Sequence, residues 1–136
     1  MKERYYELID ERVFEQELEN GLRLFVIPKP GFQKTFVTYT TQFGSLDNQF
    51  KPLGQDQFVT VPDGVAHFLE HKLFEKEEED LFTAFAEDNA QANAFTSFDR
   101  TSYLFSATDN IENNIKRLLT MVETPYFTKE TVDKNL

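Results

Sequence analysis

The residues whose types and spacing could do chemistry lie in one short segment. The chain has two histidines, His67 and His71, and Glu70 stands between them in the pattern His-x-x-Glu-His. On an α-helix, side chains at positions i and i+4 are neighbours with Cβ atoms about 5–6 Å apart, so two imidazoles can bind one metal ion. Neutral imidazole suits zinc, and two histidines with one carboxylate form a common catalytic set. The spacing therefore predicts Zn²⁺ as cofactor, with His67 and His71 as ligands.

Glu70 has a different expected role from the two histidines. A carboxylate beside a metal-bound water can take a proton from that water as it attacks a carbonyl, so we expect Glu70 to be the catalytic base. The pattern is the inverzincin signature, the reverse of His-Glu-x-x-His. The alternative interpretation is a His/Glu cluster that is solvated on a helix surface and binds no metal.

These three side chains need a helix to hold them at this spacing. Asp63 precedes the run VAHFLEHKLFEK and is expected to be the N-cap of a helix of about three turns. Val65, Phe68, Leu69 and Leu73 supply the apolar face on which that helix packs.

Strands are expected before this helix. Asn20-Gly21 separates Phe14–Glu19 from Leu22–Pro28 and indicates a β-hairpin, because both turn positions need a positive φ. Thr35–Phe43 is rich in β-branched and aromatic residues and is expected to be a further strand, and Ser45–Pro62 a long loop.

The same patterns predict the elements after the helix. They are helices over Leu81–Glu87, Ile111–Val122 and from Lys129 to Leu136, and antiparallel strands over Ala92–Phe98 and Thr101–Thr108. The expected core includes Phe68, Phe74, Phe82, Phe85, Phe95, Phe98 and Phe105, and the apolar stripe Ile111, Ile115, Leu118, Leu119 and Val122. The order of elements predicts the α+β class, with helices packed on one face of a mainly antiparallel sheet, and no domain boundary is visible within residues 1–136.

Composition limits the partners. Fourteen Lys and Arg against twenty-four Asp and Glu give a net charge of −10, which argues against nucleic acid and against an anionic membrane surface. The chain has no cysteine, and its N-terminal residues lack the apolar run of a signal peptide. We therefore expect a cytoplasmic protein whose partner is a peptide, a small molecule or another protein.

Several segments together resemble the N-terminal part of the pitrilysin/insulinase family of zinc peptidases, including its bacterial processing-type members. PDGVAHFLEHKLFEK resembles the family's metal-binding helix, and NGLRLFVIPKPG its opening hairpin. FGS at 43–45 resembles the end of the following strand, and NAFTSFDRTSYLF at 93–105 resembles the family's Asn-Ala-x-Thr strand and its return strand.

The resemblance implies a role for each matching residue. His67 and His71 match the zinc ligands, and Glu70 matches the catalytic base. Asn93 and Ala94 match the edge strand that binds substrate, where an extended peptide adds as an extra strand.

The resemblance also implies that parts of the enzyme lie outside this chain. The family's third zinc ligand is a Glu on a later helix, and neither Glu123 nor Glu130 lies in a segment like that helix. The family's enzymes also enclose substrate between two homologous halves. Residues 1–136 are therefore expected to be a single, incomplete N-terminal peptidase domain, truncated from a larger one.

Three hypotheses about function follow. The first is the metal-bearing N-terminal portion of a zinc-dependent endopeptidase, inactive as this fragment, with a peptide substrate and either a homo-oligomeric partner or a second peptidase half. The second is a non-catalytic peptide- or partner-binding domain of the same fold. The third is an unrelated α+β binding domain in which the His/Glu spacing is fortuitous and binds no metal.

Overall fold

Residues 1–77 and 80–134 are described by a computed structural model, which divides into two units, residues 1–33 and residues 34–136. The first unit is a three-stranded antiparallel sheet of β1 (Lys2–Tyr6), β2 (Glu11–Glu17) and β3 (Arg23–Val26), in that order. The predicted hairpin is confirmed, since β2 and β3 pair up to Glu17 opposite Arg23. The expected positive φ at both turn positions is wrong, because Gly21 has a φ of +86° but Asn20 does not have a positive φ. Strand β1 was not predicted, because its five residues are all exposed and carry no apolar periodicity.

The second unit contains the elements around the histidine helix. Its main sheet has the order β4-β8-β7, all antiparallel, and the bounds of the strands are β4 (Thr35–Thr41), β7 (Ala90–Thr96) and β8 (Thr101–Ala107). Its helices are α1 (Val65–Phe74), α2 (Leu81–Glu87), α3 (Ile111–Glu123) and α4 (Lys129–Lys134). The expected helix to Leu136 is confirmed as far as Lys134, and 135–136 lie outside the described residues.

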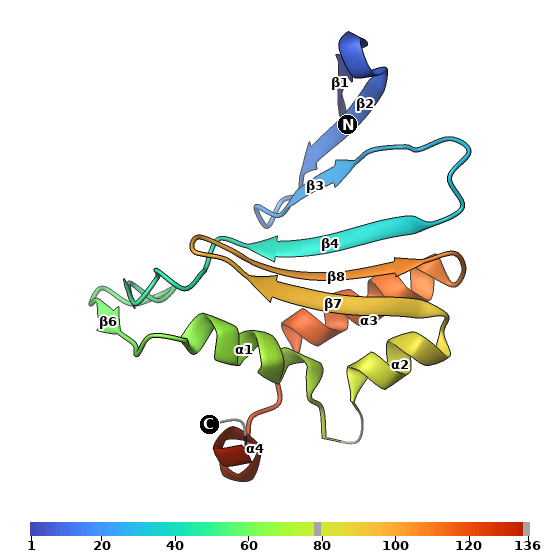
Figure 1. Ribbon diagram of the computed structural model, residues 1–136. Helices are drawn as coiled ribbons and strands as arrows, with labels where there is room; N and C mark the ends of the chain where they lie inside the picture. Colours follow the sequence, from blue (N-terminus) through green and yellow to red (C-terminus); the bar gives the residue numbers. More distant parts are fainter. Residues whose placement is uncertain (78–79, 135–136) are drawn as a thin grey trace. The chain divides into compact units, whose positions relative to one another are not determined.

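Helices α1, α2 and α3 cover one face of the β4-β8-β7 sheet (Figure 1). Residues of a strand alternate between the two faces, and Tyr103, Phe105 and Ala107 of β8 are buried beneath the helices. Phe85 of α2 and Leu118 of α3 complete this core from the other side. The α+β class, with helices on one face of an antiparallel sheet, is confirmed.

The chain crosses the β7–β8 turn closely just after β4. A Cβ at Gly44 would lie 2.5 Å from the backbone oxygens of Ser97 and Phe98, so a larger residue does not fit there. Backbone hydrogen bonds from Ser45 N to Ser97 O and from Leu46 N to Phe98 O hold this crossing. The expected loop over 45–62 is interrupted only by the short pair β5 (Gln49–Phe50) and β6 (Val59–Thr60).

Part of the expected core is wrong. Phe74, Phe85 and Phe105 are buried and Phe68 is half-buried, but Phe82, Phe95 and Phe98 are 44%, 43% and 70% exposed. Phe95 lies on the sheet face that the helices leave open, and Phe98 lies in the β7–β8 turn. Ile115 of the predicted stripe on α3 is exposed. Asn114 and Met121, which lie on α3 outside that stripe, are fully buried.

The expected N-cap of α1 is also wrong. Gly64 holds the N-cap position with a φ of +88°, a left-handed conformation that glycine adopts without strain. The Asp63 carboxylate instead accepts a 3.4 Å hydrogen bond from the Asn48 side chain. In residues 1–77 and 80–134, no helix has the length and apolar character needed to cross a bilayer.

Candidate metal and catalytic site

Helix α1 presents the two histidines together on its exposed side. His67 and His71 lie one turn apart with their rings stacked, the centroids 4.7 Å apart and the planes 9° apart. Their Nε2 atoms are 2.8 Å apart, so one imidazole donates a hydrogen bond to the other. Both side chains border an open hollow of about 400 Å³ with Gly64 and Phe68. The structure thus brings the two predicted ligands to one point.

The paired imidazoles suit a zinc ion as the first half of its ligand set. Two nitrogens bound at ~2.0–2.1 Å with tetrahedral geometry lie about 3.3 Å apart, so a small opening of the pair is enough. Within residues 1–77 and 80–134, no group of three His, Cys, Asp or Glu side chains converges. Glu123 and Glu130 are both exposed and do not join the histidines. The described residues therefore supply two donors.

Glu70 turns toward strand β7. Its Oε2 accepts a 2.6 Å hydrogen bond from the hydroxyl of Thr96, the last residue of β7. Beneath it lies Tyr103, whose pKa is raised to about 12 by burial and, second, by the negative charge of Glu70. Tyr103 therefore stays neutral at physiological pH, and Glu70 is a half-buried carboxylate held by one strong donor.

Asn93 and Ala94 lie on β7, an edge strand of its sheet. Among the described residues β7 pairs only with β8, so its other edge is open. Asn93 is exposed, and its side-chain oxygen accepts a 2.8 Å hydrogen bond from the backbone nitrogen of Ala94. A hollow of about 510 Å³, bordered by Phe82 of α2 and Leu104 of β8, runs along the first half of this strand. The backbone at this edge can pair with an added strand.

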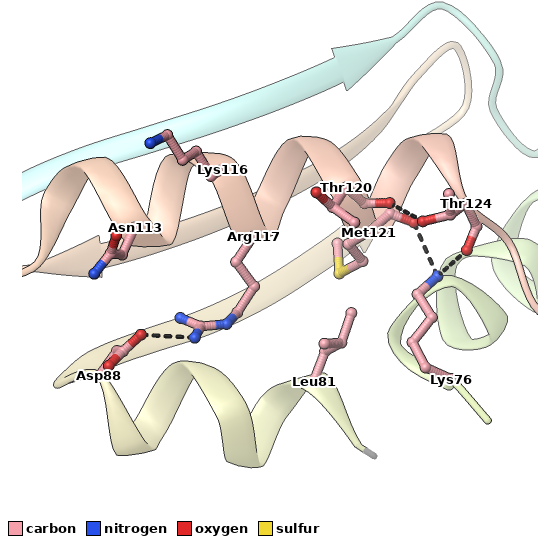
Figure 2. Close-up of a pocket in the computed structure, with 9 residues that line it drawn as sticks. All are labelled: Lys76, Leu81, Asp88, Asn113, Lys116, Arg117, Thr120, Met121 and Thr124. Carbon is pink, nitrogen blue, oxygen red and sulfur yellow. Dashed lines mark hydrogen bonds and ion pairs between the residues drawn. The ribbon is translucent and has the colours of Figure 1, made fainter. Parts of the chain in front are cut away.

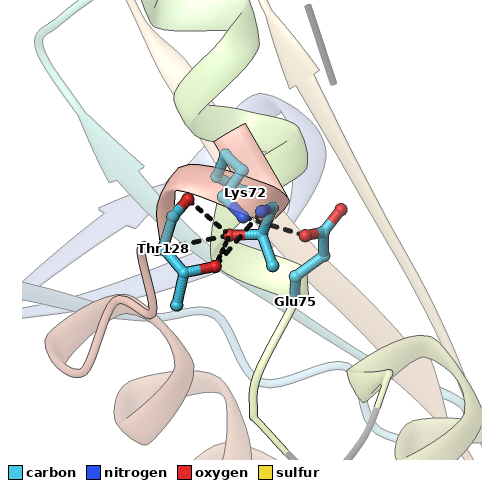
Figure 3. Close-up of polar contacts among 4 residues, drawn as sticks. Lys72, Glu75 and Thr128 are labelled. Carbon is cyan, nitrogen blue, oxygen red and sulfur yellow. Dashed lines mark hydrogen bonds and ion pairs between the residues drawn. The ribbon is translucent and has the colours of Figure 1, made fainter. Parts of the chain in front are cut away.

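A buried lysine that was not predicted lies next to the histidines. Lys72 has a fully buried side chain, and its Nζ lies 2.8 Å from the carboxylate of Glu75 (Figure 3) and 5.9 Å from the centre of the Phe127 ring. The contact between Lys72 and Phe127 joins the end of α1 to the segment that leads into α4. Helical spacing could have indicated the burial of Lys72, because Lys72 lies four residues after Phe68 and so shares the packing face of the helix.

Removing one partner of this ion pair should cost more than replacing the lysine with an apolar residue. We expect Glu75→Gln to lower the free energy of unfolding by about 2 kcal/mol, because it leaves a buried ammonium without its counter-charge. Lys72→Met should change it by less than about 1 kcal/mol, since Glu75 keeps a part-exposed side chain that water can solvate. Urea unfolding of both variants tests this asymmetry, and a larger loss for Lys72→Met would contradict it.

A third hollow, of about 390 Å³, lies between α2 and α3 and contains none of the predicted site residues (Figure 2). Arg117 forms a 2.6 Å ion pair with Asp88 across it. Lys76 donates hydrogen bonds to the backbone oxygens of Met121 and Thr124 at the end of α3. Burial, and then repulsion from Lys72, lower the pKa of Lys76. These cations already have partners, and their role is to hold helix ends together.

Residues 61–136 match the family described as insulinase (peptidase family M16). The chain is 54% identical over 129 residues to the uncharacterized zinc protease YmfH of Bacillus subtilis. This match covers 95% of the chain and 30% of that protein. It is 27% identical over 128 residues to human insulin-degrading enzyme, covering 88% of the chain and 11% of the enzyme. The chain also resembles the crystal structure of a protein described as M16-like peptidase, from Alicyclobacillus acidocaldarius, with a TM-score of 0.84 and 40% sequence identity. The match covers 91% of this chain and 29% of the chain in that structure. The chain thus spans less than a third of the length of each.

Proposed function

The chain belongs to the insulinase family of peptidases, and on that premise we propose that residues 1–136 form the metal-bearing N-terminal portion of a zinc-dependent endopeptidase. The observation that carries this proposal is the pair of His67 and His71 Nε2 atoms, 2.8 Å apart, with Glu70 held one residue away. Relatives named zinc proteases support the choice of metal. We propose that 1–136 are a single, incomplete peptidase domain.

Each site residue has a separate role in the proposed reaction. His67 and His71 would hold the ion, which when bound polarises the scissile carbonyl and acidifies a water. Glu70 accepts a proton from the attacking water and returns it to the leaving amine. Thr96 donates a hydrogen bond to Oε2 of Glu70, so the other carboxylate oxygen of Glu70 is available for the proton.

Strand β7 is the proposed place for the substrate. An extended peptide laid along the open edge at Asn93 and Ala94 would form backbone hydrogen bonds, which give affinity with little dependence on side-chain sequence. The strand ends at Thr96, the hydrogen-bond partner of Glu70, so a peptide on this edge runs toward the catalytic base.

The test combines a binding and an activity measurement. Isothermal titration calorimetry should show zinc binding to the 136-residue chain. A chain extended to the length of its relatives should cleave a quenched fluorescent peptide, lose this activity with a chelator and regain it with zinc. Activity that survives complete removal of the metal would contradict the proposal.

A second candidate function is a non-catalytic peptide- or partner-binding domain of the same fold. The observation that favours it is the open edge of β7 within residues 1–77 and 80–134, where the backbone can pair with an added strand. This candidate predicts that the extended chain binds peptides along β7 but does not hydrolyse them with or without zinc.

We expect the 136-residue chain alone to have no measurable peptidase activity and to run as a dimer or larger in light scattering. Phe36 and Phe95, 65% and 43% exposed, lie on the sheet face that α1, α2 and α3 leave open, and self-association would bury them. The proposed partner is therefore a second copy of the chain or a second peptidase half. Separately, we propose that the protein is located in the cytoplasm. A monodisperse monomer that cleaves peptides with added zinc would contradict this expectation.

A further inference from the structure

We propose that Thr96 is the positioning residue of Glu70, and this inference rests on the proposed function. The Thr96 hydroxyl donates a 2.6 Å hydrogen bond to Glu70 Oε2, joining the metal-binding helix to the last residue of the edge strand. The two residues are 26 positions apart in the chain, so only folding brings them together. The contact is short, as expected for a hydroxyl that donates to a carboxylate.

Thr96 is itself held firmly. It pairs with Thr101 across the β7–β8 hairpin, and Ser97 N donates to Arg100 O to close the turn. Thr101 is buried and donates to the backbone oxygen of Phe43, which fixes this end of the hairpin to the segment just after β4. Because threonine is β-branched, its χ1 angle is restricted, and the hydroxyl keeps one direction. The donor that meets Glu70 is therefore preorganised.

Glu70 needs such a donor more than a shorter carboxylate would. A glutamate side chain has three rotatable bonds, and a half-buried one that is not bonded samples several rotamers. Fixing Oε2 on Thr96 restricts the positions that Oε1 can take. A general base must lie within hydrogen-bond reach of its proton, and a displacement of about 1 Å can reduce the rate about 100-fold.

The hydrogen bond could alternatively serve only to pack α1 on β7. A matched control separates the two roles, because Thr40 Oγ1 forms a 2.7 Å hydrogen bond with Ser102 Oγ in the same sheet, between β4 and β8. Thr40→Val and Thr96→Val each remove one half-buried hydroxyl bond and keep the side-chain volume. A purely structural role should lower the free energy of unfolding of both variants and change kcat in neither.

The kinetic test uses a chain extended to the length of its relatives. We expect Thr96→Val to lower kcat by about 10-fold to 100-fold, with KM within about 2-fold and one zinc per chain retained. Thr96→Ser, which keeps the hydroxyl, should recover kcat to within about 3-fold, and Thr40→Val should leave kcat unchanged. A kcat for Thr96→Val no lower than that for Thr40→Val, or loss of zinc, would overturn the proposal.

A second measurement does not depend on activity. In the 136-residue chain, NMR three-bond couplings of the Glu70 side chain should report one rotamer in the wild type and in Thr96→Ser, and averaged rotamers in Thr96→Val. Averaging already present in the wild type would overturn the positioning role even if the extended enzyme is active. One rotamer in the wild type and averaging in Thr96→Val, in a protein that hydrolyses no peptide, would instead refute the proposed function alone.

Discussion

Glu70→Gln, introduced into a chain extended to the length of its relatives, is expected to reduce peptide hydrolysis by about 100-fold to 10,000-fold while one zinc per chain stays bound. The amide accepts no proton from the attacking water, but it keeps the size of the side chain and can still accept the hydrogen bond from Thr96. Because Glu70 is bonded to β7 and not to the histidines, its replacement should leave the two imidazoles where they are. Steady-state kinetics and metal analysis of the same sample measure both effects.

Glu87→Gln provides the matched control for this change. Glu87 is an exposed residue at the end of α2, and its conversion to Gln removes the same charge from the same unit. This control should keep both zinc and activity. If Glu70→Gln loses its metal as well as its turnover, Glu70 is a ligand, and the role assigned to it is wrong.

His71→Ala is expected to lower the zinc affinity of the 136-residue chain by at least about 10-fold, because it removes one of two imidazole donors. His67→Ala should have a similar effect. If both imidazoles bind the same ion, the double variant should lose little more affinity than either single variant, since one remaining donor already binds weakly. Calorimetric zinc titration measures all three.

The control for the histidine variants is Asn113→Ala, an exposed substitution on α3, which should bind zinc as the wild type does. Circular dichroism of each variant should show that α1 is retained. Equal titration curves for the wild type and His71→Ala would refute the assignment of the two histidines to one metal site.

Local patterns predicted the elements well where the cause lies within a few residues. The Asn20-Gly21 turn and helix α2 were placed correctly, because a turn and a capped helix depend on neighbours in sequence. Asp80 caps α2 by accepting a hydrogen bond from the backbone nitrogen of Phe82. Helix α1 was placed within a residue of its start, but its cap was assigned to Asp63 and not to Gly64, because either residue can begin a helix.

Burial was predicted less well than secondary structure. Phe85 and Phe95 are the same residue type in adjacent elements, yet one is fully buried and the other is 43% exposed. Which face of a sheet is covered depends on where the helices cross it, and no local pattern of hydrophobicity contains that information. The same reason explains why the full burial of the Lys72 side chain against Glu75 was not predicted.

By itself, the sequence determined the proposed chemistry of this protein: two histidines one helical turn apart must share a helix face, so spacing alone predicted that they are neighbours. Only the tertiary structure decided what surrounds them. The hydrogen bond from Thr96 to Glu70 joins residues 26 positions apart. The edge at Asn93 is open among the described residues because β7 is last in the order β4-β8-β7. Contacts of this kind depend on how strands pair and helices pack across the whole unit, which spacing within one segment does not specify.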